Sequence, residues 1–259
     1  MQRRYTGEII ASRPFGRCVE LVLETAARFD AEPGQFVHVR CEGAGLILRR
    51  PYSICHAGEG TVSLLVQVVG AGSAWLAAAE VGSRLDFLGP LGRGFNTEAS
   101  GRYTLIAGGA GIAPIRFLAS RLRDQGRETV VFWGMETVDE YRGLSDVLMG
   151  ECDLRLVSMD GSAGCTGNVI DTFKRSERGD IANICACGPR GMLSALAECI
   201  DEDTLACLQV CMEERMACGI GACRGCAVPA VSPRGGYLAV CKDGPVFWGR
   251  ELDWKRLSG

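Results

Sequence analysis

Hydrophobic and polar residues alternate over short stretches in the first part of the chain, up to about residue 97. The hydrophobic stretches are rich in Val, Ile, Leu and Phe, and Gly or Pro separates them; they occupy residues 8–25 (two runs), 33–41, 49–55, 60–70 and 83–92. Six short strands with such turns predict a small antiparallel β-barrel. One helical segment, residues 73–80, interrupts the strands.

The pattern changes near residue 98, where strand-like and helix-like segments begin to alternate. Residues 102–126 predict a strand, a glycine turn and an amphipathic helix, and the alternation continues through strands at 128–135 and 152–161 and helices at 144–150 and 167–175. A further strand, turn and helix occupy residues 181–200. This order is typical of a doubly wound α/β domain with a parallel sheet, which we expect to end near residue 205.

The last part of the chain is rich in Cys and Gly and shows little periodicity. A segment this short cannot bury a core of its own, so a metal centre is expected to stabilise it. We therefore predict three domains: 1–97, an antiparallel β-barrel; 98–205, a doubly wound α/β domain; and 206–259, a small cysteine-rich domain.

The composition of the chain argues against several classes of function. The net charge is −3, with 28 basic and 31 acidic residues and no basic stripe, which argues against nucleic-acid binding. The sequence has no run of 18 apolar residues and no signal-peptide pattern, so no membrane span is expected. Ten of the fourteen cysteines are scattered, which is typical of buried, reduced thiols in a cytoplasmic protein.

The other four cysteines form one motif. Cys218, Cys223, Cys226 and Cys241 are spaced C-x4-C-x2-C-x14-C, and C-x4-C-x2-C followed by a distant Cys is the plant-type spacing for a [2Fe–2S] cluster. The glycines between the first two ligands would let backbone N–H groups point at the cluster sulfurs. A structural zinc site and unligated thiols remain alternatives, although zinc sites usually contain two closely spaced pairs.

Three further segments suggest nucleotide binding. In "RRPYSI", residues 49–54, an Arg, an aromatic ring and a hydroxyl follow one another on a predicted strand, as a flavin nucleotide would require. Gly70, Gly72 and Ser73 lead into the helix of the barrel, where free N–H groups can hold a pyrophosphate or Ser73 can simply act as an N-cap. Glycine turns at 108–111 and 187–189 each follow a predicted parallel strand, at the sheet edge where nucleotides bind.

Taken in order, "RRPYSI", "GGAGIAP" and "CGPRGML" resemble the ferredoxin–NAD(P)+ reductase superfamily. The tail, "MEERMACGIGACRGCAV" followed by "VCKDGPVF", is similar to that of the electron-transfer subunits of class 1B dihydroorotate dehydrogenases. The resemblance covers essentially the whole chain.

The resemblance implies three cofactors, FAD, NAD(H) and a [2Fe–2S] cluster, and assigns residues to each. For FAD it implies Arg50 on the pyrophosphate, Ser53 near the flavin ring, and further contacts from Pro51, Tyr52, Val66, Gln67, Val68, Gly72 and Ser73. For the nicotinamide nucleotide it implies Gly109, Ala110, Gly111, Ile112, Ala113, Pro114, Cys187, Gly188 and Pro189. It also implies that the four motif cysteines ligate the cluster.

The sequence departs from the family pattern at three places. Gln67 stands where an Arg is expected, which weakens one flavin contact, and Ala110 stands where a Gly is common. Arg224 and Gly225 replace a commoner Tyr–Ala pair between two cluster ligands, so we expect them to alter the surface offered to a partner.

The function implied is a relay between NADH, FAD, the cluster and the FMN of a separate catalytic subunit that interconverts dihydroorotate and orotate, in a heterotetramer of two of each. Acidic residues after the second strand of the sheet, among them Glu136, favour NADH over NADPH. No general acid or base is required of this chain, and His38 and His56 are expected to be ordinary strand or turn residues. A reductase subunit for another partner or a ferredoxin, and a zinc-stabilised flavoprotein-like sensor, are the alternatives.

Overall fold

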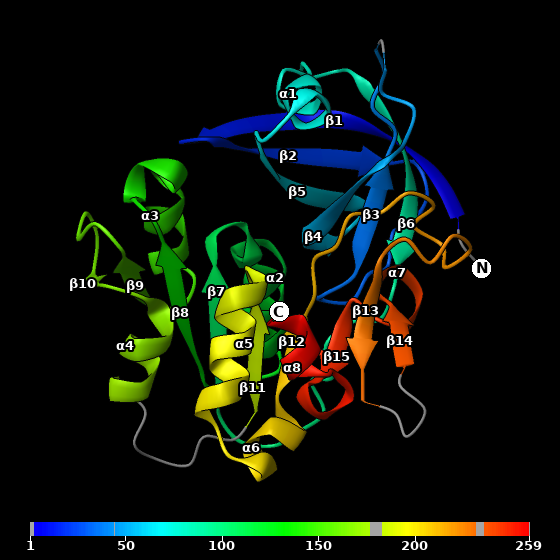
Figure 1. Ribbon diagram of the computed structural model, residues 1–259. Helices are drawn as coiled ribbons and strands as arrows, with labels where there is room; N and C mark the ends of the chain where they lie inside the picture. The colour runs from blue at the N-terminus through cyan, green and yellow to red at the C-terminus, as the bar shows by residue number, and fades with distance from the viewer. Residues whose placement is uncertain (1–2, 44, 177–182, 232–235, 259) are drawn as a thin grey trace.

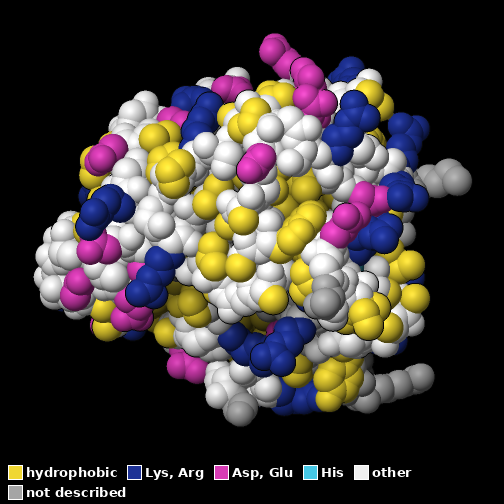
Figure 2. Space-filling view, turned by 90° about the horizontal axis from the view of Figure 1, so that it is seen from above, with side chains coloured by type: hydrophobic (Ala, Val, Ile, Leu, Met, Phe, Trp, Pro, Cys, Tyr) yellow, Lys and Arg dark blue, Asp and Glu magenta, His cyan; other side chains and the backbone are white. Residues whose placement is uncertain are grey.

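A computed structural model describes residues 3–43, 45–176, 183–231 and 236–258. The β-barrel lies above the central sheet, and the end of the chain lies along one side of both (Figure 1). None of the helices in these ranges is long and apolar enough to cross a membrane. On the face shown in Figure 2, basic and acidic side chains are intermingled around a region where hydrophobic side chains predominate.

The barrel contains the six strands that the alternating pattern predicts: β1 (Arg3–Phe15), β2 (Cys18–Thr25), β3 (Phe36–Val39), β4 (Arg50–Gly58), β5 (Thr61–Gln67) and β6 (Arg84–Leu91). They close in the order β1-β2-β5-β4-β3-β6, all antiparallel. Inward-facing side chains such as Ile9, Leu64 and Val66 are fully buried. The prediction of an antiparallel barrel is therefore confirmed.

The helix of the barrel, α1 (Ala71–Ala77), begins earlier than predicted. Its N-cap is Gly70, so Ser73 is the third helical residue and not the cap. The Ser73 hydroxyl accepts hydrogen bonds from the backbone N–H groups of Val69, at 2.9 Å, and Gly70, at 3.0 Å. Ser73 thus satisfies the backbone ahead of the helix from inside its first turn, as in a capping box.

The central sheet contains seven strands: β7 (Tyr103–Gly108), β8 (Thr129–Met135), β9 (Asp153–Ser158), β10 (Cys165–Thr166), β11 (Ile184–Cys187), β12 (Gln209–Cys211) and β15 (Val246–Trp248). Their order is β10-β9-β8-β7-β11-β12-β15. All neighbours are parallel except β12 and β15. The helices α2 (Ile112–Asp124) and α3 (Leu144–Met149) pack on one face, while α4 (Val169–Ser176) and α5 (Arg190–Cys199) pack on the other.

The expectation that the sheet ends near residue 205 is wrong. After α6 (Glu202–Cys207), the chain enters β12, which pairs in parallel with β11, and much later returns as the edge strand β15. Both strands have only three residues, too few for hydrophobic alternation to reveal them. Between them lie the hairpin β13 (Ala227–Ala230) and β14 (Gly236–Ala239), then α7 (Val240–Asp243); α8 (Trp254–Leu257) follows β15.

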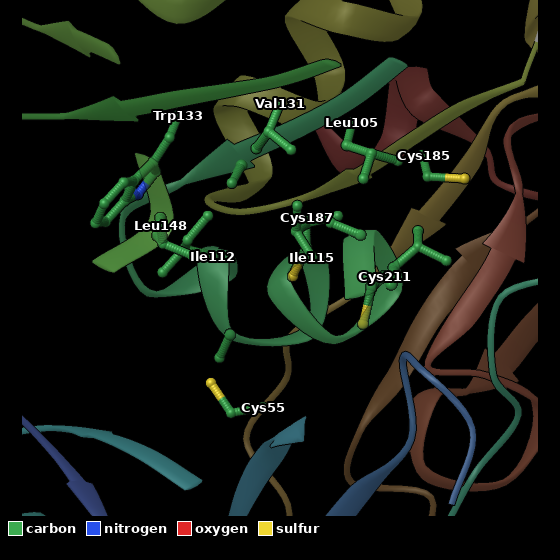
Figure 3. Packing of buried hydrophobic residues seen from close by; sticks show 14 of the residues in the cluster. Cys55, Leu105, Ile112, Ile115, Val131, Trp133, Leu148, Cys185, Cys187 and Cys211 are labelled. Carbon is green, nitrogen blue, oxygen red and sulfur yellow. The ribbon is translucent and has the colours of Figure 1, made fainter. Parts of the chain in front are cut away.

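A hydrophobic core lies between the sheet and α2, on the side that faces the barrel (Figure 3). Ile112 and Ile115 of α2 meet Leu105, Val131 and other fully buried strand residues. Cys55 reaches this core from β4 of the barrel, so the barrel and the sheet share one apolar interior. At about 25 cal/mol per Å² of buried apolar surface, such contacts hold the two units together.

One ion-pair network also crosses from the barrel to α2. Arg116 of α2 lies 2.7 Å from the carboxylate of Glu20 on β2 and pairs with both carboxylate oxygens of Glu151, at 2.8 and 2.9 Å. The Glu20 side chain is only 4 % exposed and that of Arg116 16 %. Because a buried carboxylate needs a counter-charge, this network restricts how the barrel sits on the sheet.

We expect Arg116→Ala to lower the free energy of unfolding by about 3 kcal/mol, since it leaves Glu20 buried without its main partner. Urea denaturation followed by circular dichroism measures the change. Arg28→Ala is the matched control, because it removes an exposed pair with Asp30 and should leave the midpoint unchanged. An equal loss of unfolding free energy in the two variants would contradict the stabilising role of the ion pair between Arg116 and Glu20.

Candidate functional site: two adjoining cavities and a cysteine loop

The larger cavity, of about 900 Å³, opens between the barrel and the segment that follows β12. Four consecutive predicted residues of β4 line it: Arg50, Pro51, Tyr52 and Ser53. The opposite wall, residues 211–216, comes from the end of β12 and the stretch that leads into residues 217–226. These residues, with Cys241 beside them, are called the cysteine loop below. Its size and its mixture of aromatic, apolar and cationic groups fit a flavin nucleotide.

Arg50 lies against the start of α1. A Cβ atom at Gly72 would come within 2.9 Å of the Arg50 Nε, so a larger residue there would displace the guanidinium from this position. The guanidinium also donates to the carbonyl of Leu48. The structure thus brings the predicted Arg50 and Gly72 together beside the helix N-terminus, although neither Gly72 nor Ser73 lines the cavity itself.

Strand β5 presents alternate side chains to the cavity. Leu65 and Gln67 line it, whereas Val66 points into the barrel core and is fully buried. Val68 is 43 % exposed and is not among the lining residues. Any contact of Val66 with a flavin would therefore be made by the backbone. The predicted roles of Val66 and Val68 stay predictions.

A second cavity, of about 400 Å³, lies at the carboxyl ends of the sheet strands. The predicted Gly109, Ala110 and Pro189 line it, together with Gly108 and Met192. The two glycine turns pack closely, since a Cβ at Gly188 would lie 2.9 Å from the backbone nitrogen of Gly108. Of the other predicted residues, Ala113 lines the larger cavity, and the rest are buried: Gly111, Ile112, Pro114, Cys187 and Gly188.

The far wall of the second cavity is acidic. Glu136, directly after β8, and Glu140 line it, as does the buried Tyr141. The Gln67 amide donates to the Tyr141 hydroxyl at 3.3 Å, so the residue found in place of the expected Arg joins the barrel to the sheet domain. Carboxylates at this position suit ribose hydroxyls and repel a 2′-phosphate.

The four predicted ligand cysteines lie close together as two pairs. The backbone N–H of Cys223 lies 3.4 Å from the Cys218 thiol, and the N–H of Cys241 lies 3.4 Å from the Cys226 thiol. Within the residues described, no three His, Cys, Asp or Glu side chains converge as ligands of a single metal ion. Two pairs suit a two-iron cluster, in which each iron takes two thiolates.

Backbone N–H groups surround these sulfurs. Those of Cys223 and Ile220 lower the pKa of the Cys218 thiol to about 6, whereas burial raises the pKa of the Cys241 thiol to about 12. Gly221 nevertheless donates its N–H to the Cys241 sulfur at 3.1 Å. The donor set therefore fits the sulfur-rich, negatively charged cluster that the spacing predicts.

The cysteine loop packs against the barrel strand that borders the larger cavity. Gly219 has a φ of +68° and approaches the His38 imidazole so closely that a Cβ there would overlap the ring. Burial lowers the pKa of His38 to about 4, so the ring is neutral. Phe36, two residues earlier on β3, lines the cavity. One short strand thus connects the cysteine loop to the cavity.

Sequence reasoning missed several lining residues. Met212, Glu213, Arg215 and Met216 line the larger cavity, and Glu213 lines the smaller one as well. The available signal was a pair of charged residues, Glu213 and Glu214, directly after a short apolar run. Such residues at the carboxyl end of a parallel strand face the ligand crevice, but the strand itself was not recognised.

Three family models match the chain in succession. The oxidoreductase FAD-binding domain matches residues 16–95, the oxidoreductase NAD-binding domain matches 105–198, and the iron–sulfur cluster binding domain of dihydroorotate dehydrogenase B matches 213–253. The chain is therefore an oxidoreductase with FAD, NAD and iron–sulfur binding domains.

Among solved structures, a chain of the NADH-dependent reduced ferredoxin–NADP oxidoreductase has a similar fold, with a TM-score of 0.83 at 28 % sequence identity. The match covers 97 % of this chain and 92 % of the other, which comes from a study of flavin-based electron bifurcation. A ferredoxin reductase of carbazole 1,9a-dioxygenase shares the fold, with a TM-score of 0.69 at 20 % identity over 81 % of this chain and 69 % of that one.

Two relatives of the chain share the name dihydroorotate dehydrogenase B (NAD(+)), electron transfer subunit. The protein of Caldanaerobacter subterraneus subsp. tengcongensis is 36 % identical over 223 residues, which cover 85 % of this chain and 86 % of the relative. That of Clostridium acetobutylicum is 35 % identical over 231 residues, 89 % of each chain. With these identities and the matching cysteine domain, the chain belongs to the family of electron transfer subunits of dihydroorotate dehydrogenase B.

Proposed function

We propose that this chain passes electrons between NADH and the FMN of a dihydroorotate dehydrogenase catalytic subunit, in a cytoplasmic heterotetramer of two of each. FAD would occupy the larger cavity, the nicotinamide ring would enter the smaller one, and a [2Fe–2S] cluster would be held by the cysteine loop. None of the fourteen cysteines is in a disulfide, which suits a reducing compartment. The proposed domains are 1–97 for FAD, 98–205 for NAD and 206–259 for the cluster, and β12 and β15 of the last segment complete the central sheet of the NAD domain.

The observation that carries this proposal is the continuity of the three sites. Gln67, Ala110 and Glu213 line both cavities, and β3 extends from the larger cavity to the cysteine loop. Bound FAD supplies the chemistry that links a two-electron hydride to single-electron transfer. The chain itself contributes position: β4 and Arg50 would orient the flavin nucleotide, and the glycine turns would admit the nicotinamide nucleotide beside it.

The acidic wall of the smaller cavity predicts a preference for NADH. In stopped-flow experiments, NADH should reduce the bound flavin at least about tenfold faster than NADPH, because Glu136 would repel a 2′-phosphate. Glu136→Gln should reduce the ratio between the rates of flavin reduction by NADH and by NADPH. Asp139→Asn is the matched control, because the Asp139 carboxylate is exposed, pairs with Arg142 and does not line the cavity. This variant should leave the ratio of the NADH and NADPH rates unchanged. Equal rates with both nucleotides in the unaltered chain would refute the preference.

The cysteine loop offers a matched pair of glycine variants. Gly219→Ala should strongly reduce cluster content, since its φ of +68° disfavours a side chain and the new Cβ would strike His38. Gly225→Ala should retain it, because its Cβ would meet only the Cys223 sulfur at 3.6 Å. Iron and sulfide analysis measures the outcome, with about two of each expected per unaltered chain. Full cluster content in Gly219→Ala would show that the loop does not need this approach.

The role as a subunit predicts that activity divides between two proteins. This chain alone should reduce an artificial dye with NADH and should not oxidise dihydroorotate. Adding the FMN-containing catalytic subunit should produce orotate with NAD+ as the acceptor. The similarity to a ferredoxin–NADP oxidoreductase chain supports a second candidate, a reductase subunit for another partner. Dye reduction without any orotate formation by the combined subunits would favour that candidate.

A further inference from the structure

Three residues form the common wall of the two cavities: Gln67, Ala110 and Glu213. If the proposed function is correct, the flavin ring and the nicotinamide ring meet at this wall, because hydride transfer requires direct contact between the reacting atoms. Gln67 and Ala110 are uncharged. Among the described residues that line both cavities, Glu213 is therefore the one that can carry a charge.

The position of Glu213 is fixed by the sheet. It follows β12 by two residues, and β12 pairs with β11 so that Cys211 lies opposite Cys187. The Cys187 thiol lies 3.9 Å from Glu213 Oε1. In Figure 3 the thiols of Cys187 and Cys211 both point from the sheet toward the barrel side. This pairing places the Glu213 carboxyl at the mouth between the two cavities.

Among the described residues, no cationic side chain pairs with the Glu213 carboxyl. Its side chain is exposed to the open cavities, yet it lies deep enough for desolvation to raise the pKa of the carboxyl. The nearby cation Arg190 is paired with Glu214. Within the described ranges, the Glu213 carboxyl accepts a hydrogen bond from the Cys187 thiol, which is a weak donor. A ligand that brought a positive charge to this wall would therefore meet an uncompensated carboxylate.

We propose that the ionised Glu213 carboxylate stabilises positive charge on the nicotinamide ring, so that the chain binds the oxidised nucleotide more tightly than the reduced one. When NADH gives up hydride, a hydrogen with both bonding electrons leaves the ring for the flavin. The ring is oxidised to a pyridinium cation, and the flavin is reduced. A carboxylate beside the ring lowers the energy of that cation, and of the transition state that leads to it.

This role predicts a specific pH dependence. NAD+ affinity should rise as pH increases through the pKa of Glu213, since only the ionised form attracts the cation. Among the described residues, the titratable groups that interact with the Glu213 carboxyl are the Cys187 thiol and the Tyr141 hydroxyl. Hydrogen bonding to Cys211 and burial raise the pKa of the Cys187 thiol, and burial raises that of the Tyr141 hydroxyl, so neither of these two gains charge in the same range. Glu136 and Glu140 line only the smaller cavity and remain in every variant.

The test measures binding to the oxidised, FAD- and cluster-loaded chain. Two probes are titrated calorimetrically between about pH 4.5 and 8, a range that begins close to the ordinary pKa of a glutamate and extends above it. They are NAD+ and tetrahydro-NAD, whose partly reduced ring is neutral and does not donate hydride. Glu213→Gln keeps the shape of the side chain and removes its charge. Glu202→Gln, in the exposed first turn of α6, removes the same charge far from both cavities.

We expect Glu213→Gln to weaken NAD+ binding about tenfold at pH 8, to change tetrahydro-NAD binding less than about twofold, and to abolish the pH dependence of NAD+ affinity. Glu202→Gln should match the unaltered chain. Equal weakening of both probes would show that Glu213 only fills space, and no weakening would show that the ring lies elsewhere; either result overturns the proposal. If neither probe binds the unaltered chain, the nicotinamide site of the proposed function fails as well.

Discussion

The parallel pairing of β12 with β11 is the constraint on which the rest of the site depends. Three residues of the tail extend the central sheet, with Cys211 opposite Cys187. The chain then leaves the sheet at its carboxyl edge, runs along the larger cavity and reaches the cysteine loop. If β12 were not part of the sheet, Glu213 would have no fixed position relative to the two cavities.

Close backbone approach is the second requirement, and glycine provides it at a few places. Gly188 lies against the backbone of Gly108, which lets two strand-to-helix turns lie side by side. Gly219, in the left-handed region, brings the cysteine loop onto the imidazole of His38. Electron transfer and hydride transfer both demand short distances, and a side chain at any of these positions would separate the groups that must meet.

Sequence reasoning succeeded where a pattern is local and repeated. The barrel strands alternate, the sheet strands alternate with helices, and the cysteine spacing predicts an iron–sulfur centre, which the matching family model also names. All three patterns involve residues close together in the chain. It failed for β12 and β15, which are too short to show a period and whose extended conformation is imposed by their neighbours. It also misplaced the start of α1, because Ser73 satisfies the backbone from within the first turn.

The sequence by itself determined the order of the barrel and the parallel sheet and the candidate cluster ligands, because these depend on local patterns, and its resemblance to a known family implied the cofactors. Only the tertiary structure decided which side chains meet. That Arg116 pairs with Glu20, that Gln67 contacts Tyr141, and that Glu213 stands between two cavities are consequences of long-range packing. No local pattern encodes such contacts, because each joins segments brought together only when the barrel, the sheet and the tail bury a common interior.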